Sequence, residues 1–257
     1  MPPSDKEGEI RAYYRTLWQA WGPQHWWPAR TRFEVIVGAY LTQNTAWTNV
    51  EKALANLREQ RLLTVSGIRR ARLSKLERLI RPSGYFRQKA KKLKTFVAFL
   101  DSNYGGSLTN LFAAPVNRLR EQLLALNGVG PETADSILLY AGDHPVFVVD
   151  AYTRRILDRH QILPADSRYE EVRQLFERAL SRLVDPRKSV DLPVAERFKP
   201  GGASHPPSPM STAQRPPLAQ LYNEMHGLIV GVGKNYCRKS QPRCDECPLR
   251  KFLPASK

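Results

Sequence analysis

The chain has little cysteine and no long apolar run. Only 3 of its 257 residues are cysteine, and an odd number clustered after residue 236 argues against a disulfide framework. The longest apolar runs are too short to span a bilayer, and the first residues, Met-Pro-Pro-Ser-Asp-Lys-Glu, contain no apolar signal core. We therefore expect a monomeric, cytoplasmic protein without a membrane partner, associated with the nucleoid if it is bacterial.

Acidic residues are also few relative to basic ones. The chain has 24 Asp and Glu against 40 Lys and Arg, which gives a net charge of +16. A solvated basic surface would account for this excess, but neutralising phosphates is the commoner reason for it. The composition therefore favours a polyanionic partner.

Sustained alternation of apolar and polar residues, which is typical of strands, is missing from the chain. Apolar residues instead recur at three- and four-residue spacing, which indicates about ten helices. The predicted helices cover residues 9–20, 31–43, 47–57, 87–100, 116–126, 131–141, 147–159, 168–183 and 218–231. Residues 146–149 alone could form a strand, and the proline-rich residues 185–217 are expected to be a flexible insertion. The predicted fold class is all-α.

A glycine turn joins two of the predicted helices. Helix 116–126 leads through Gly128, Val129 and Gly130 into helix 131–141, whose first turn contains Thr133. Glycine lets the backbone approach a ligand closely, and the N–H groups that open a helix favour an anion such as phosphate. A helix C-cap would also explain a lone Gly-x-Gly. In this basic chain we expect a helix-hairpin-helix motif in which Gly128, Val129, Gly130 and Thr133 bind a nucleic-acid backbone.

Asp150 directly follows the apolar residues 146–149. A charge in this position is costly unless it has a hydrogen-bonding or oppositely charged partner, or a function. Asp150 suits the N-cap of helix 151–159, and this structural role is compatible with a second one. We expect Asp150 to be a catalytic carboxylate, because a fixed carboxylate can stabilise a developing positive charge or orient water.

All five tryptophans lie within the first 47 residues. Trp26, Trp27 and Pro28 fall between two predicted helices, where an exposed pair of indoles would be costly without a use. Aromatic walls can hold a base that has been flipped out of a duplex, and they favour a cationic base in particular. The alternative is that these residues simply plug the core.

The hairpin and Asp150 resemble the endonuclease III-like DNA glycosylases. In that family the hairpin reads Leu-x-Gly-Val-Gly-x-Lys-Thr-Ala, and an aspartate follows the lysine by eighteen residues. Here Glu132 stands in place of the lysine, and Asp150 follows it at the same distance. A carboxylate cannot attack the sugar C1′ as the lysine amine does. The resemblance therefore implies a monofunctional glycosylase; the alternatives are a bifunctional glycosylase/AP lyase on oxidised pyrimidines and a non-catalytic lesion-binding protein.

The resemblance covers nearly the whole chain and implies its organisation. Residues 1–250 would form one glycosylase unit of two helical lobes with a DNA-binding cleft between them. One lobe would hold the hairpin and span about 30–140, and the other would combine 1–29 with 147–236. Asp150 and the pair Trp26–Trp27 are expected to face each other across the cleft. The implied partner is double-stranded DNA with a damaged base.

Four segments are similar to the 3-methyladenine glycosylases of this fold. These are Trp26–Pro28, Phe33–Glu34, Gly38–Thr45 and Arg81–Phe86. The similarity implies an alkylated purine as substrate and a base pocket formed by Trp26, Trp27, Pro28 and Trp47, although this branch has Phe in place of Trp47. An adenine glycosylase acting on oxidised-guanine mispairs is disfavoured, because Ala39 occupies the place of the Glu that it would need.

Other residues are expected to contact DNA. By the same resemblance, Asn44 or Gln43 fills the gap left by the flipped nucleotide, although a helix C-cap would also explain Asn44. The basic run 87–94 contains Lys89, Lys91 and Lys92. We expect these lysines to contact phosphates, the alternative being a plain solvated face.

The three cysteines form the last motif. Cys237, Cys244 and Cys247 lie in a Cys-rich loop over residues 237–253, and their spacing resembles Cys-x6-Cys-x2-Cys-x5-Cys, which holds a [4Fe–4S] cluster in the endonuclease III family. The fourth position is Leu253, which is not a ligand. An iron–sulfur cluster with water or another fourth ligand, a zinc site, and inert thiols packed as small hydrophobes all stay open.

Overall fold

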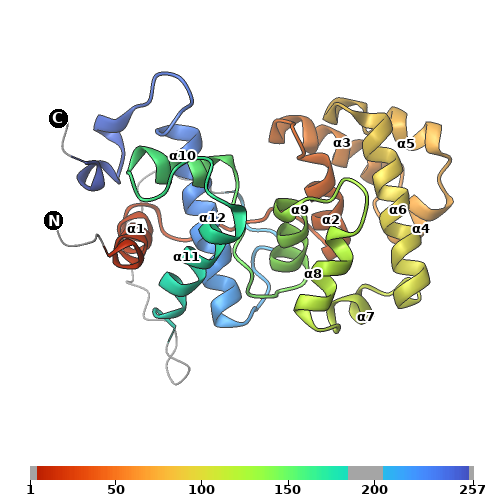
Figure 1. Cartoon of the computed structure of the whole chain (residues 1–257). Helices are drawn as coiled ribbons and strands as arrows, with labels where there is room; N and C mark the ends of the chain where they lie inside the picture. Colours follow the sequence, from red (N-terminus) through yellow and green to blue (C-terminus); the bar gives the residue numbers. More distant parts are fainter. Residues whose placement is uncertain (1–4, 185–204, 255–257) are drawn as a thin grey trace. The chain divides into compact units, whose positions relative to one another are not determined.

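The computed structural model describes residues 5–184 and 205–254, and these residues contain helices but no strand. This confirms the predicted all-α class (Figure 1). The chain divides into two compact units: the terminal unit combines Met1–Pro28 with Pro145–Lys257, and the central unit spans Ala29–His144. None of the described helices has both the length and the apolar character that crossing a membrane requires.

The central unit is built around α2 (Arg32–Leu41), whose residues from Phe33 to Leu41 are all buried. Helix α2 packs against the helices α3, α6 and α9 and against the π-helical turn η2. The other elements of this unit are α3 (Trp47–Glu59), α4 (Val65–Arg70), α5 (Leu73–Leu79), the 3-10 turn η1 (Arg81–Ser83), α6 (Phe86–Tyr104), α7 (Leu108–Phe112), α8 (Val116–Leu124), α9 (Pro131–Ser136) and η2 (Ile137–Ala141).

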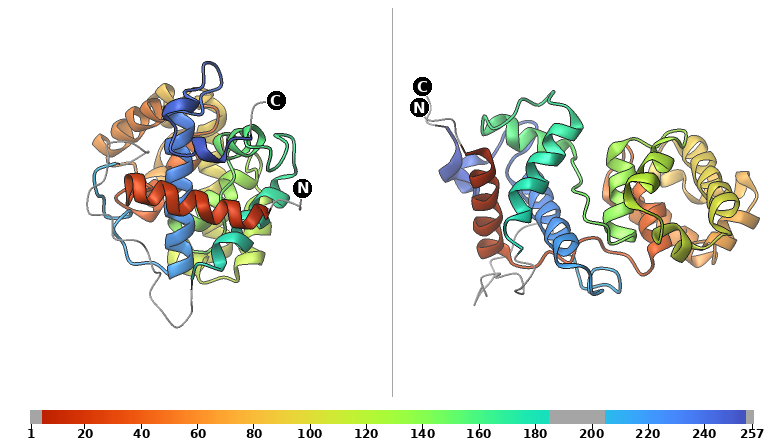
Figure 2. Two further views of the ribbon diagram at one scale, coloured as in Figure 1. Left: turned by 90° about the vertical axis from the view of Figure 1, so that its left-hand side faces the viewer. Right: turned by 60° about the horizontal axis from the view of Figure 1, so that its bottom comes forward.

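The terminal unit packs around α12 (Pro217–Asn235), which contacts three other helices of this unit. These are α1 (Lys6–Trp21), α10 (Ala151–Arg159) and α11 (Tyr169–Ser181). In the left view of Figure 2, α1 crosses α12. The 3-10 turns η3 (Cys244–Glu246) and η4 (Arg250–Phe252) follow α12.

The apolar residues 146–149 form neither a strand nor a helix, which corrects the predicted start of a helix at 147. Side chains satisfy their backbone instead: the N–H of Phe147 donates to Glu177 (3.0 Å) and that of Val149 to the Tyr169 hydroxyl (3.3 Å). The Phe147 ring stacks on Phe176, with centroids 4.3 Å apart. Residues 146–149 are therefore buried without pairing to a neighbouring strand. The next residue, Asp150, is the N-cap of α10.

Other predicted boundaries also change. Helix α2 ends at Leu41, two residues before the predicted end at 43. Of the predicted flexible insertion 185–217, residues 185–204 lie outside the described residues. Residues 205–216 are ordered: Ser208 and Ser211 bond each other through a turn, and Met210 is buried.

Candidate active site and DNA-binding elements

Asp150 is held at the N-terminus of α10 by a reciprocal cap. Its Oδ1 accepts hydrogen bonds from the backbone N–H (2.8 Å) and the hydroxyl (2.9 Å) of Thr153, whose hydroxyl also accepts from the N–H of Asp150 (3.4 Å). Such a cap fixes the side-chain rotamer. The side chain is 13% exposed. Asp150 is thus a fixed carboxylate with one oxygen committed to the helix.

The second oxygen of Asp150 faces a buried histidine. Oδ2 lies 3.7 Å from Nε2 of His226 on α12. Burial lowers the pKa of His226, and the nearby Asp150 charge opposes this shift only in part. The imidazole is therefore neutral at neutral pH, and it does not compensate the negative charge of Asp150.

The Trp26–Trp27 pair lies in the same unit as Asp150 and is buried. Each residue is 6% exposed, and the ring centroids are 5.6 Å apart in an edge-to-face arrangement. The Trp26 ring lies 6.0 Å from the His226 ring, so His226 contacts both Trp26 and the catalytic candidate. This corrects the expectation that the two would face each other across a cleft between lobes, because both belong to the terminal unit. The burial of the pair is what the alternative interpretation, residues that plug the core, predicts.

A glycine on α12 permits this packing. A Cβ on Gly227 would come within 3.0 Å of Cβ of both Gln24 and Trp26. The segment is further tied to α12 by Glu224, whose Oε2 accepts from the Gln24 N–H (2.8 Å). Burial raises the pKa of Glu224 to about 7.

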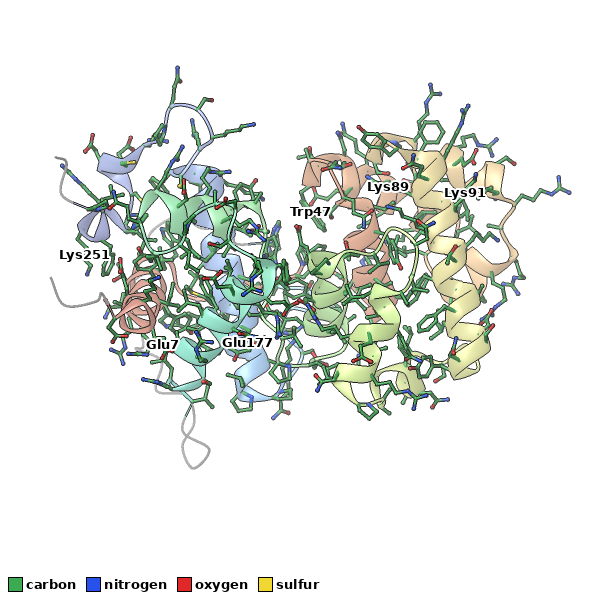
Figure 3. The ribbon with its side chains drawn as sticks, viewed as in Figure 1. Glu7, Trp47, Lys89, Lys91, Glu177 and Lys251 are labelled. Atoms are coloured by element: carbon green, nitrogen blue, oxygen red, sulfur yellow. The ribbon has the colours of Figure 1, made fainter. Side chains whose placement is uncertain are left out.

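The other two expected pocket residues are less buried. Pro28 is half-buried and is the last residue of the first segment of the terminal unit. Trp47 is half-buried at the first position of α3 and belongs to the central unit (Figure 3). Of the expected pocket, the structure therefore brings Trp26 and Trp27 together within one unit.

The helix-hairpin-helix is present in the central unit, between α8 and α9. Gly128 has φ +78°, a left-handed conformation that requires glycine. Gly130 is extended and has open space around it, so the conformation itself does not require glycine there. Val129 and Thr133 are buried, with 7% of each residue exposed. Gly128 and Gly130 are exposed, so a phosphate at this hairpin would meet the backbone of these two glycines.

Two side-chain contacts fix the hairpin. Arg120 on α8 forms a bidentate pair with the fully buried Asp135 on α9, at 2.6 and 3.1 Å. Gln43 donates to the carbonyl of Gly128 (3.0 Å) and to the Thr133 hydroxyl (2.9 Å). Gln43 in turn accepts from Nζ of Lys92 (2.7 Å). Gln43 and Lys92 therefore brace the hairpin.

Asn44 is exposed and has φ +52°. It lies in a loop of residues 42–45 that follows α2. Sequence reasoning missed a second exposed residue beside this loop, Tyr85, which is 64% exposed with φ +43°. Its neighbour Ser83 accepts a hydrogen bond from Thr45. Tyr85 directly follows a glycine at the start of a basic helix, and this is the signal that could have identified it.

The lysines of α6 divide into two kinds, although the sequence suggested one. Lys91 is exposed, as expected of a phosphate contact, whereas Lys89 is only 2% exposed. Figure 3 marks both on α6. Burial, with a smaller contribution from Lys92, lowers the pKa of Lys89 to about 8. The predicted phosphate contact by Lys89 is therefore corrected: its ammonium is enclosed by protein.

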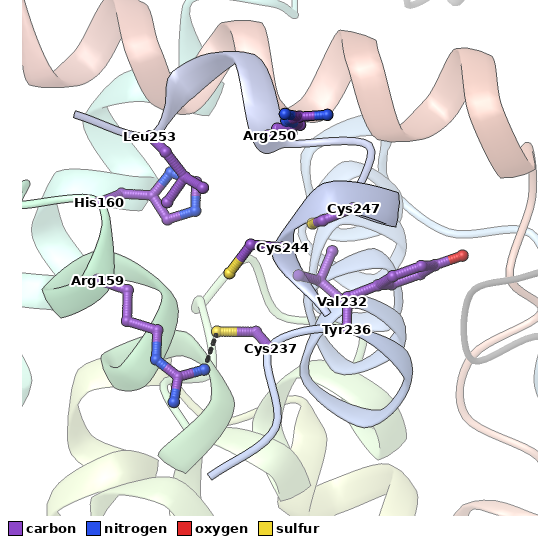
Figure 4. Close-up of a pocket in the computed structure, with 9 residues that line it drawn as sticks. All are labelled: Arg159, His160, Val232, Tyr236, Cys237, Cys244, Cys247, Arg250 and Leu253. Carbon is purple, nitrogen blue, oxygen red and sulfur yellow. Dashed lines mark hydrogen bonds between the residues drawn. The ribbon is translucent and has the colours of Figure 1, made fainter. Parts of the chain in front are cut away.

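The three cysteines line one cavity in the terminal unit, together with Arg159, His160 and Leu253 (Figure 4). Arg159 donates to Sγ of Cys237 at 3.3 Å. Burial raises the pKa of Cys247 to about 11, so this thiol keeps its proton at neutral pH.

The residues present do not fit the four-thiolate cluster of the endonuclease III family. Leu253 occupies the fourth position, and the cavity of about 10 Å³ has room for about one water molecule. In residues 5–184 and 205–254, no three Cys, His, Asp or Glu side chains are close enough to hold a metal ion. The iron–sulfur cluster stays a prediction.

Comparison with known proteins decides the family. Residues 37–182 match the HhH-GPD superfamily of base excision DNA repair proteins. The chain belongs to this superfamily. It is 40% identical over 247 residues to a Methanocaldococcus jannaschii protein provisionally assigned as a DNA repair glycosylase (MJ1434), a match that covers 95% of this chain and 94% of the relative. It is also 26% identical to endonuclease III of Thermotoga maritima, over 85% of this chain and 80% of that protein.

Two solved structures are similar to the structure of this chain. The Helicobacter pylori 3-methyladenine DNA glycosylase MagIII, bound to 1,N6-ethenoadenine, superposes with a TM-score of 0.69 and 29% identity, covering 90% of this chain and 97% of that one. An endonuclease III trapped covalently on DNA has a TM-score of 0.66 at 20% identity, covering 96% of this chain and 95% of that chain, which supports the fold alone. This member of the superfamily is therefore a DNA repair glycosylase.

Proposed function

We propose that this protein is a monofunctional DNA N-glycosylase that removes alkylated purines. The observation that carries the proposal is Glu132, on the first turn of α9, in the place where the endonuclease III family has its lysine. Without that amine the sugar C1′ cannot form a Schiff base with the enzyme. Water is then the nucleophile. The 29% identity to MagIII, named a 3-methyladenine glycosylase, supports the substrate class.

In the proposed reaction the C1′–N bond of the damaged nucleotide breaks and a water oxygen bonds to C1′. An alkylated purine carries a positive charge and leaves as a neutral base, so no strong general acid is needed. The sugar becomes positively charged in the transition state. The carboxylate of Asp150 stabilises this charge and takes the proton released by the water. The fixed rotamer of Asp150 suits this role, because no reorganisation is required when charge develops.

The proposed base pocket uses Trp26, Trp27 and Pro28 of the terminal unit. A cationic purine is attracted to the electron-rich face of an indole. The cysteine-rich loop takes no part in this reaction.

DNA contact is proposed for four exposed features of the central unit. The backbone of the hairpin and the ammonium of Lys91 bind phosphates. Asn44 fills the gap in the stack when the damaged nucleotide leaves it. Tyr85, an exposed aromatic beside the loop of Asn44, stacks on a neighbouring base.

The test is base release. Duplexes carrying one alkylated, deaminated or oxidised base are incubated with the protein, and the free base is identified by mass spectrometry. We expect release of alkylated purines, with the strand left intact until alkali is added. Release of oxidised pyrimidines with strand nicking would establish the bifunctional alternative. Lesion binding without any base release would establish a non-catalytic binder.

A further inference from the structure

Lys89 is the one lysine that is buried in residues 5–184 and 205–254. Its Nζ donates three hydrogen bonds, to the carbonyls of Leu41 (2.8 Å) and Ser83 (2.6 Å) and to the hydroxyl of Thr45 (2.7 Å). An ammonium has three N–H donors, so all are used. A buried charge is costly unless it is fully hydrogen-bonded. This residue and its three acceptors are called the Lys89 clamp.

The acceptors of the clamp belong to separate segments. Leu41 ends α2, and Ser83 ends η1. Carbonyls at the end of a helix lack a partner within it, and Lys89 supplies one to Leu41. The Thr45 hydroxyl also donates to the carbonyl of Ser83. The clamp therefore fastens both ends of the loop 42–45 to the first turns of α6.

The clamp holds two exposed residues in left-handed backbone conformations. Asn44 (φ +52°) directly precedes Thr45, and Tyr85 (φ +43°) follows Ser83 by two positions. L-residues rarely adopt this conformation, and it persists only where the surrounding structure fixes it. The hydrogen bonds of Lys89 provide that fixation from inside the unit.

We propose that Lys89 is a positioning residue, which holds the loop 42–45 in the shape from which Asn44 enters the gap left by the flipped nucleotide. The inference rests on the proposed function, which gives Asn44 this role. Lys89 itself touches no DNA, because its ammonium is enclosed. A loop that is already ordered does not pay for ordering when DNA binds. The clamp therefore raises the affinity of the protein for a duplex with a base missing from the stack, relative to its affinity for an intact duplex.

The test measures affinity for two duplexes, one intact and one containing a tetrahydrofuran abasic analogue. The ratio of the two Kd values is the gap preference. We expect Lys89→Met and Asn44→Ala each to lower this preference roughly tenfold, since each breaks the same contact. The double variant should be no lower than Asn44→Ala alone. Lys91→Met, two residues along the same helix, should weaken binding to both duplexes by the same factor.

A second pair of variants covers the case that Lys89→Met does not fold. Thr45→Val removes one acceptor of the clamp at nearly constant volume, and Thr45→Ser keeps the hydroxyl. We expect the valine variant to lose gap preference and the serine variant to retain it. Thermal unfolding of each variant checks that the native state is populated.

Three results would overturn the inference: an unchanged preference in folded Lys89→Met or Thr45→Val, an unchanged preference in Asn44→Ala, or a double variant that loses the product of the two single factors. Base release from alkylated DNA is measured in parallel. A wild-type protein that releases no base, but whose gap preference depends on Lys89 through Asn44, would refute the enzymatic proposal and leave this inference standing.

Discussion

Oδ2 of Asp150 lies 3.7 Å from Nε2 of His226 in the terminal unit. Because burial lowers the pKa of the imidazole, the ring beside the carboxylate is neutral at neutral pH. A cationic partner would stabilise the carboxylate in the resting enzyme and weaken its attraction for a positively charged sugar. A neutral neighbour keeps that attraction for the transition state, which is the condition for catalysis.

Asp150→Asn should separate the two roles of this residue. Asparagine is as good an N-cap as aspartate, so we expect the free energy of unfolding to change by less than about 1 kcal/mol. The amide carries no negative charge, so base release should fall by about 100-fold or more. Single-turnover base release and urea denaturation measure the two quantities. DNA affinity is the control and should stay within a few-fold of the wild type.

Two outcomes would contradict this prediction. Retained base release would remove Asp150 from the reaction. A large loss of stability would mean that the asparagine no longer bonds to Thr153, and the loss of rate would then have a structural cause.

Glu132→Lys tests the interpretation of the hairpin. The variant places an amine on the first turn of α9, where the endonuclease III family carries its lysine. An amine can displace the base at C1′ and form a Schiff base, which borohydride reduces to a stable adduct. We expect a trapped protein–DNA band on a denaturing gel for the variant and none for the wild type. Glu132→Gln, which has no amine, is the matched control; an adduct with the wild type would establish the bifunctional alternative.

Local signals in the sequence were sufficient to predict the capped start of α10 and the long amphipathic helices. An aspartate between an apolar run and a helix, with Thr153 three residues later, is the pattern of a capped helix start. Long amphipathic helices such as α6 and α11 were found by their periodicity. Helices α4, α5 and α7 have 6, 7 and 5 residues, which is too short for a repeat of 3.6 residues to show.

For Lys89, the sequence contains the signal for burial but not the identity of the hydrogen-bond acceptors. Within the basic run it precedes Leu93 by four residues and Phe96 by seven, which puts it on the apolar face of the helix. That spacing could have predicted burial. It could not have predicted the acceptors, because Leu41, Thr45 and Ser83 are brought to the Lys89 ammonium by the fold. A lysine on an apolar stripe therefore needs tertiary structure before it can be interpreted.

Glu224 should make stability depend on pH. Its carboxylate accepts from the N–H of Gln24 (2.8 Å) and from Gln220 (3.0 Å), and burial raises its pKa from 4.5 to about 7. Between these two values the folded protein binds a proton that the unfolded chain has released. The free energy of unfolding contributed by this group therefore falls as the pH rises from 4.5 to 7.

Glu224→Gln removes this dependence, since the amide does not titrate. We expect the variant to gain stability relative to the wild type as the pH rises from 5 to 8, by at most about 3 kcal/mol. Urea denaturation at these two pH values measures the difference in free energy of unfolding between the variant and the wild type. The contributions of all other titrating groups cancel in this difference. Parallel pH profiles for the two proteins would show that Glu224 is ionised in the fold throughout the range.

Leu253→Cys tests the cysteine-rich loop. Leu253 lines the same cavity as Cys237, Cys244 and Cys247, at the spacing where the endonuclease III family has its fourth thiolate. Four thiolates hold a [4Fe–4S] cluster, whereas three leave one iron without a protein thiolate. After anaerobic reconstitution with iron and sulfide, we expect the variant to bind more iron than the wild type and to keep its visible absorbance longer in air. Leu253→Ser opens the same space without a thiol and is the control. Equal iron content in the wild type and the cysteine variant would show that the missing thiolate is not what limits cluster binding by this loop.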